Sequence, residues 1–124
     1  MRRWKGRWVM AVALVHTAFA VVVFGSELAA LLRDGLIDTV GNDARRGAVV
    51  WFLLFGPALW LAGQGIDVLE ARQQPLPRAM GVTLLFLVAL GAALMPASGF
   101  WLALPPALAM LWPARATAGS ASAP

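Results

Sequence analysis

Apolar residues fill four long runs of the chain, which are separated by short polar stretches. The runs cover about residues 8–32, 48–66, 79–95 and 99–112, and the helix of the last run can be extended to residues 98–114. The first two reach the roughly 20 residues with which a helix crosses a hydrocarbon core about 30 Å thick; the third is slightly short and the fourth clearly short. The pattern predicts an all-α protein, an integral membrane four-helix bundle. It forms one domain over residues 1–114, followed by a small, polar tail (115–124) expected to be disordered and cytoplasmic.

The first run follows a basic segment, "MRRWKGRW", and therefore resembles a signal peptide. The small residues Ala18–Ala20, "AFA", mimic a cleavage site. The apolar run continues through Val21–Phe24, beyond that point. We therefore expect an uncleaved first helix.

Composition supports a membrane protein. Of 124 residues, 60% are hydrophobic and 13% are charged, whereas soluble domains average about 45–50% and about 25%. The chain has no cysteine, which excludes disulfides, thiolate catalysis and cysteine-ligated clusters. The net charge of +4 is not a nucleic-acid signal, because the basic residues crowd the N-terminus directly before an apolar run.

The distribution of basic residues predicts the orientation of the chain, since cytoplasmic segments carry more Lys and Arg. Seven flank one side of the predicted bundle: Arg2, Arg3, Lys5, Arg7, Arg72, Arg78 and Arg115. The other side has three: Arg33, Arg45 and Arg46. We therefore expect a multi-pass protein of the inner membrane with both termini cytoplasmic. The outward-facing loop contains residues 34–43, which have the character of a short interfacial helix.

Polar side chains inside the predicted spans are costly and therefore informative. His16, the only histidine, lies about 12 Å deep when Trp8 marks the boundary. One interpretation is a neutral imidazole that is hydrogen-bonded to another helix. The functional alternatives are a proton relay or a ligand of haem or a metal. A single histidine without cysteine cannot form a zinc site from side chains alone.

Further polar residues lie nearer the predicted boundaries. Glu27 is either an interface carboxylate paired with Arg33, Arg45 or Arg46, or the outer mouth of a polar path. Gln64 and Asp67 are either interface groups or the inner mouth of the same path. Thr83 lies slightly inside the third span.

Two adjacent prolines interrupt the fourth run. In the interior of a helix, Pro105 and Pro106 would deprive the carbonyls of Trp101 and Leu102 of their usual donors. Those carbonyls lie at about the depth of His16. We therefore predict a hydrogen bond from His16 to one of them and a mid-membrane polar pocket, with candidate residues His16, Gln64, Thr83, Trp101, Leu102, Pro105 and Pro106.

Three segments carry a resemblance to a known family: "LPRAMG" (Leu76–Gly81), "MPASGFW" (Met95–Trp101) and "RRGAVVWFLLFG" (Arg45–Gly56). They resemble a family of small four-helix integral membrane proteins of bacteria, grouped as a domain of unknown function. The resemblance covers about residues 1–113. It implies the same topology and brings neither an activity nor a cofactor.

The sequence leaves three functions open. Because no hydrolase, kinase or metalloprotease motif is present, the first is a non-catalytic accessory or structural component of the membrane, with no cofactor. The second is a small transporter or channel subunit with His16 in a polar path. The third is a binder of haem, quinone or lipid, with Trp60, Phe100 and Trp101 around an apolar pocket. Expected partners are the lipid bilayer and a second copy or another membrane protein, but no nucleic acid.

Overall fold

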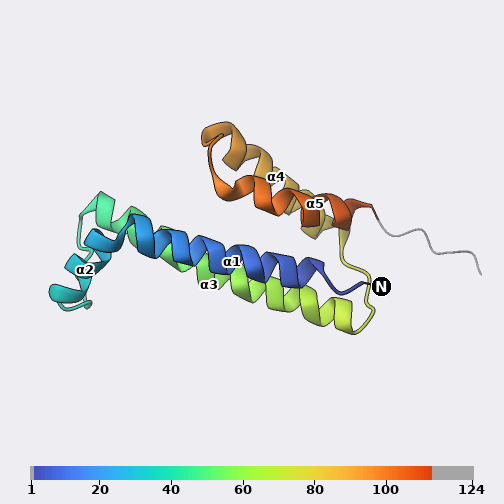
Figure 1. Ribbon diagram of the computed structural model, residues 1–124, viewed down its shortest axis with the longest axis horizontal. Helices are drawn as coiled ribbons and strands as arrows, with labels where there is room; N and C mark the ends of the chain where they lie inside the picture. The colour runs from blue at the N-terminus through green and yellow to red at the C-terminus, as the bar shows by residue number, and fades with distance from the viewer. Residues whose placement is uncertain (1, 113–124) are drawn as a thin grey trace, which may run out of the picture.

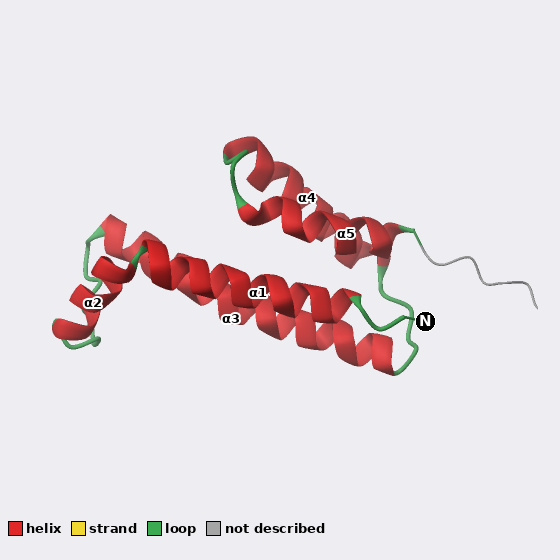
Figure 2. Ribbon diagram, viewed as in Figure 1, coloured by secondary structure: helices red, strands yellow, loops and turns green. Residues whose placement is uncertain are grey.

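The computed structural model describes residues 2–112, and these form helices and loops without strands. The helices are α1 (Lys5–Val23), α2 (Gly25–Arg33), α3 (Ala44–Ala71), α4 (Arg78–Leu94), the 3₁₀ helix η1 (Gly99–Ala103) and α5 (Leu104–Leu111). Figure 1 shows two antiparallel helix pairs, α1 with α3 and α4 with α5, and Figure 2 shows that loops are confined to their ends. The fold is all-α, as predicted.

The α1–α3 pair is held together by small residues at heptad spacing. On α1, Gly6, Ala13 and Ala20 are buried, and on α3 the buried positions include Val49, Gly56, Gly63 and Glu70. Both series repeat every seven residues. A repeat of seven keeps one seam of each helix facing its partner, and small side chains on that seam let the two backbones approach closely.

Two glycines show how close this approach is. A Cβ built on Gly6 would lie 2.3 Å from the backbone nitrogen of Asp67. A Cβ built on Gly63 would lie 2.6 Å from Cγ of Met10 and 2.9 Å from its backbone nitrogen. Since the nearest atoms include backbone, neither position has room for a side chain.

The second pair also packs on glycines. A Cβ on Gly91 of α4 would lie 2.3–2.5 Å from three ring carbons of Phe100 in η1. A Cβ on Gly81 would lie 2.9 Å from Cβ of Met110 in α5. The chain therefore returns along α4 after the turn that joins Leu94 to Gly99.

We call the end of the α1–α3 pair that holds residues 2–8 and 66–72 proximal, and the opposite end, with residues 24–46, distal. The second pair lies beside the proximal part of the first (Figure 1), where α1 borders η1 and α5. A hydrophobic cluster joins the two pairs there: Val9, Ile66 and Met110 are buried, with Leu59, Leu76, Met80 and Leu84 around them. The distal part of the α1–α3 pair extends past the second pair.

The first apolar run forms two helices instead of one. α1 ends at Val23, Phe24 takes a non-helical conformation, and α2 begins at Gly25. The helix expected within residues 34–43 is absent, because Gly35, Leu36, Asp38 and Gly41 all have positive φ angles. Such angles are incompatible with a right-handed helix. The short helix at this end is α2, which turns away from the axis of α1 (Figure 1).

The second run forms a longer helix than residues 48–66. α3 begins after Asp43, whose carboxylate accepts from the backbone N–H groups of Arg45 and Arg46, as an N-cap does. It continues through Glu70 because the acidic residues of its last turns bind the N-terminal segment, as described below. A helix, α4, also occupies the expected third segment.

The fourth run differs most from expectation. A 3₁₀ helix starts after Ser98, and α5 begins only at Leu104. Pro105 and Pro106 lie in the first turn of α5, where a missing N–H is tolerated, rather than in a helix interior. Residues 113–114 of the expected span and the tail 115–124 lie outside the described residues.

Two of the helices, α1 and α3, are each long and apolar enough to cross a membrane. α4, and η1 with α5, are shorter apolar segments. Large apolar side chains are exposed on both pairs, for example Val22 (81%), Trp51 (75%) and Leu94 (72%). Exposed apolar surface of this kind marks a contact with a membrane or with another protein.

Candidate functional site

A proximal ion-pair cluster joins the N-terminal segment to the end of α3. Arg3 donates from Nε and Nη2 to the two carboxylate oxygens of Asp67, at 3.2 and 2.6 Å. Arg7 lies 3.7 Å from the same carboxylate. Lys5 Nζ lies 3.4 Å from Glu70. Because the forked Arg3–Asp67 pair fixes two bonds at once, it sets the position of the segment before α1.

Glu70 is the buried member of this cluster, with 2% exposure. Its carboxylate accepts from the backbone N–H of Gly6 at 3.0 Å and of Lys5 at 3.4 Å. The first N–H groups of a helix have no partner inside the helix, and α1 has no side-chain cap of its own. Glu70 thus caps α1 from another helix, and its charge suits the positive end of the helix dipole.

Sequence reasoning missed Glu70, because the predicted second helix ends at residue 66. One signal was available: Asp67 and Glu70 stand three residues apart and so share a face of any helix that continues past Ile66. The basic segment was read only as an orientation signal. Its charges also have acidic partners within the chain.

A distal cluster holds the loop that joins α2 to α3. Arg46 donates to Asp34 Oδ2 at 2.6 Å and to the carbonyl of Thr39 at 2.9 Å. Arg45 pairs with Glu27, and Ser26 donates to the same carboxylate at 2.7 Å. The Ser26 hydroxyl, the backbone and Arg45 hold the pKa of Glu27 below its usual value. Glu27 is therefore an ion-paired carboxylate at the end of the molecule. Its partner, Arg45, is one of the three arginines that the sequence offered for this pair.

His16 binds α3 rather than the proline-containing segment. Its Nε2 lies 2.8 Å from the carbonyl oxygen of Phe52, and since a carbonyl only accepts, this nitrogen carries the proton. The imidazole stacks on the Phe52 ring, with centroids 4.3 Å apart, and meets the edge of Phe55. The predicted bond from His16 to Trp101 or Leu102 is therefore wrong, since α1 turns this side chain toward α3.

The carbonyl of Leu102 nevertheless receives a donor from α1. Pro106, four residues later, has no N–H to offer it. The indole Nε1 of Trp8 donates to this oxygen at 2.7 Å. The predicted type of contact, a side chain of the first helix bonded to a carbonyl freed by proline, is present with Trp8 in place of His16.

The other candidate pocket residues do not converge on His16. Gln64 on α3 and Thr83 on α4 are exposed on their helices. Pro105 is exposed, whereas Pro106 is buried. The structure thus separates the seven candidates into a His16–α3 contact, a Trp8–Leu102 contact, the buried Pro106 and side chains on the outer surface.

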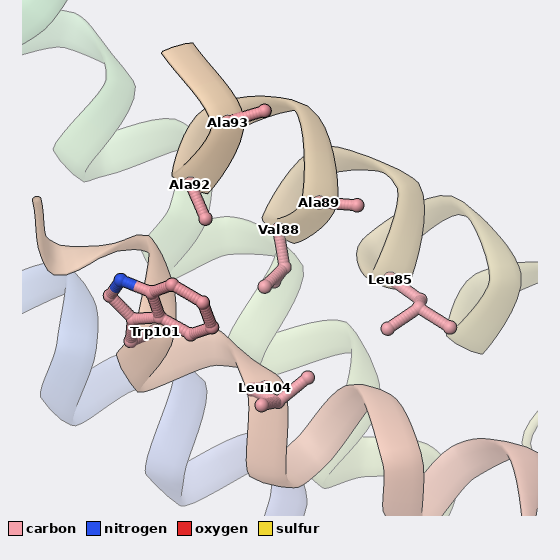
Figure 3. A pocket seen from close by; sticks show the side chains of 7 residues that line it. All are labelled: Leu85, Val88, Ala89, Ala92, Ala93, Trp101 and Leu104. Carbon is pink, nitrogen blue, oxygen red and sulfur yellow. The ribbon is translucent and has the colours of Figure 1, made fainter. Parts of the chain in front are cut away.

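An apolar cavity lies between α4 and the η1–α5 segment (Figure 3). Its volume is about 400 Å³, and it is lined by Leu85, Val88, Ala89, Ala92, Ala93, Trp101 and Leu104. Val88 and Ala92 point toward the indole of Trp101 (Figure 3). The indole Nε1 donates to the carbonyl of Pro96 at 2.9 Å. The cavity therefore offers a ligand an almost entirely apolar surface, and Trp60, Phe100 and His16 do not line it.

Chemically, these arrangements stabilise helix contacts. Within residues 2–112, no three His, Asp or Glu side chains gather in a way that could hold a metal ion. The carboxylates of both clusters are neutralised by arginine or lysine. What the geometry provides is a rigid helix pair with charged ends and an apolar middle.

Comparison with known proteins leaves activity open. No curated protein and no solved structure matches the chain. One protein family matches residues 1–117, nearly the whole sequence, and its members have no assigned function. The chain therefore belongs to the family of unknown function DUF6463.

Proposed function

We propose that the protein is a multi-pass component of the inner membrane that acts through helix contacts, as a non-catalytic accessory or structural subunit. Both helix pairs are embedded, and both termini are cytoplasmic. The proximal ion-pair cluster then lies at the cytoplasmic surface, and the loop of residues 34–43 faces outward. This topology places the more basic side of the protein in the cytoplasm.

The observation that carries the proposal is the spacing of charge along α3. No charged residue occurs from Gly47 to Ile66, a helical length of roughly 30 Å. Arg46 at one end and Asp67 at the other are both engaged in ion pairs. The uncharged length matches the hydrocarbon core of a bilayer, and α1 parallels it between Arg7 and Val23.

The topology can be tested by reporter fusion. A reporter that is active only outside the cytoplasm should be silent after the C-terminus and active when inserted in the loop of residues 34–43. Alkaline carbonate extraction should leave the protein in the membrane. Release by carbonate, or reporter activity at the C-terminus, would contradict the topology.

The accessory role predicts a protein partner on the uncovered distal surface. A photo-crosslinking residue at Val22 or Leu54, both exposed, should yield a protein adduct of defined mass, either with a second copy or with another membrane protein. The chain without a photo-crosslinking residue serves as the control and should yield no adduct. Adducts with lipid alone from every exposed position would contradict the role.

The transporter alternative depends on His16. Its Nε2–H is occupied by the Phe52 carbonyl, the Phe52 ring stacks on the imidazole, and Phe55 makes a T-shaped contact with it. We therefore expect His16→Gln to weaken the α1–α3 contact without changing proton flux in proteoliposomes. Loss of a wild-type flux in this variant, with folding intact, would favour transport instead.

A ligand-binding role has one observation in its favour, the cavity beside Trp101. Its volume of about 400 Å³ falls in the range of small-molecule sites. Its lining suits a hydrocarbon chain or the tail of a quinone better than haem, because it offers no axial ligand. Co-extraction of a quinone that disappears in Ala92→Phe would support this role.

A further inference from the structure

A second, smaller hollow lies where the two helix pairs meet. Its volume is about 210 Å³, and it is lined by Trp8, Ala11, Val12, Val15 and Leu102. Four of these residues lie on one face of α1 and the fifth on η1. The hydrogen bond from Trp8 to Leu102 fixes the proximal end of this hollow.

A cation stands at the proximal end of the same face. Arg7, Ala11 and Val15 are spaced by four residues, so they follow one another along α1 at intervals of about 6 Å. Arg7 therefore precedes the hollow by one turn. Its side chain is 64% exposed.

Arg7 has hydrogen-bonding capacity to spare. Asp67 is held by the forked bonds of Arg3, and Arg7 reaches it only through Nε at 3.7 Å. Among the described residues, the Nη groups of Arg7 have no ion-pair partner. A guanidinium with two free nitrogens presents the geometry that recognises a phosphate.

We propose that this face of α1 binds one anionic phospholipid of the surrounding bilayer. The phosphate pairs with Arg7, and an acyl chain occupies the hollow between Ala11, Val15 and Leu102. Charge and shape together argue for this occupant. Arg7 and the apolar hollow follow one another along the membrane normal, as the headgroup and the acyl chain of a phospholipid do. The proposal rests on the membrane topology proposed above.

Native mass spectrometry of the full chain in mild detergent tests the site, with phosphatidylglycerol and phosphatidylcholine of identical acyl chains as probes. The wild type should retain one phosphatidylglycerol in preference to phosphatidylcholine. Arg7→Gln should lose this preference, with affinity for phosphatidylglycerol reduced by about fivefold, as one cation near a membrane surface contributes. Arg33→Gln is the matched control at the distal end and should bind as the wild type does.

Two further arms test the hollow and the source of the phosphate. Ala11→Phe, at an exposed position, should fill the hollow and weaken both lipids. Soluble glycerol phosphate should not displace the bound lipid. Equal binding of both lipids by the wild type, an unchanged Arg7→Gln, or an equal loss in Arg33→Gln would overturn the site. Carbonate extraction keeps the two proposals apart: a variant that stays in the membrane but shows no lipid preference refutes only the lipid site.

Discussion

At the scale of single residues, the packing of α1 against α3 depends on positions that carry no side chain. Gly6 and Gly63 let α1 and α3 approach until backbone meets backbone, and Glu70 fills the space next to Gly6 with the carboxylate that the start of α1 lacks. A missing side chain and a buried charge thus act at the same place. Two substitutions separate their contributions.

Gly63→Ala should destabilise the α1–α3 pair, because its Cβ would lie 2.9 Å from the Met10 backbone nitrogen. Overpacking of this kind costs about 1–3 kcal/mol. Gly65→Ala is the matched control, two residues away in the same helix with nothing within 4 Å of its Cβ. Thermal unfolding in detergent, followed by circular dichroism, should show a lower midpoint for the first variant only. Equal midpoints would mean that the pair is less tightly packed than described.

Glu70→Ala should destabilise the protein more than any exposed acidic substitution. It leaves the Gly6 N–H and the Lys5 ammonium without their partner, and breaking a buried ion pair costs about 3–5 kcal/mol. Hydrogen exchange should show increased exchange of the first amides of α1. Glu70→Gln, which retains one acceptor, should restore part of the protection. Unchanged exchange in Glu70→Ala would refute the cap.

At the scale of helices, the distal end depends on pairing between α2 and α3. Glu27 on α2 meets Arg45 on α3, and Arg46 fastens the intervening loop to Asp34 and Thr39. Because the loop has several positive φ angles, it has no regular hydrogen-bonding pattern of its own to fix its course. The hydrogen bonds and ion pairs of the side chains fix the course of the loop instead.

The pairing of Glu27 should make this end sensitive to acid. Its pKa is lowered in the folded chain, so its stabilisation is fully present above the ordinary glutamate value of about 4.3. It is lost as pH falls through the lower folded value. The difference in melting temperature between wild type and Glu27→Gln should therefore shrink as pH falls from 7 toward 3. A difference that stays constant over this range would contradict the pairing.

The sequence predicted helices as the sole regular structure because runs of apolar residues reveal them directly. The ends of the helices were harder to predict, because they depend on partners far away in the chain. The continuation of α3 through Glu70 depends on Gly6, and the break at Phe24 precedes the loop that Arg46 holds. The pocket prediction was wrong for a related reason: depth in a span gives the level of His16 but not the side of the helix from which it projects.

At the scale of the whole molecule, the two helix pairs are joined, within residues 2–112, only in the proximal region. The hydrophobic cluster around Val9 and Met110 and the hydrogen bond from Trp8 to Leu102 form this joint. Residues 72–77 connect the pairs through the chain. The joint is therefore smaller than the seam within the α1–α3 pair.

Trp8→Phe should loosen the joint, since it keeps the ring but leaves the Leu102 carbonyl without its donor. Both residues are partly exposed, so the loss of this hydrogen bond costs about 0.5–1.5 kcal/mol. Spin labels at Val22 and Leu94, both exposed, should report a broader distance distribution between the pairs. Trp51→Phe, at an exposed tryptophan of α3, should leave the distribution unchanged. A narrow distribution in Trp8→Phe would show that the hydrophobic cluster alone holds the joint.

The unequal lengths of the two pairs have a consequence for the bilayer itself. α3 is 28 residues long and α4 is 17, or roughly 42 and 25 Å. In the bilayer topology proposed above, lipids beside α1 and α3 would meet a full hydrophobic thickness, whereas those beside α4 would have to compress by several ångströms, at a fraction of a kcal/mol for each. The protein would then set up a thickness gradient around its own circumference. Neighbours with short hydrophobic segments would gain most by gathering on its thin side.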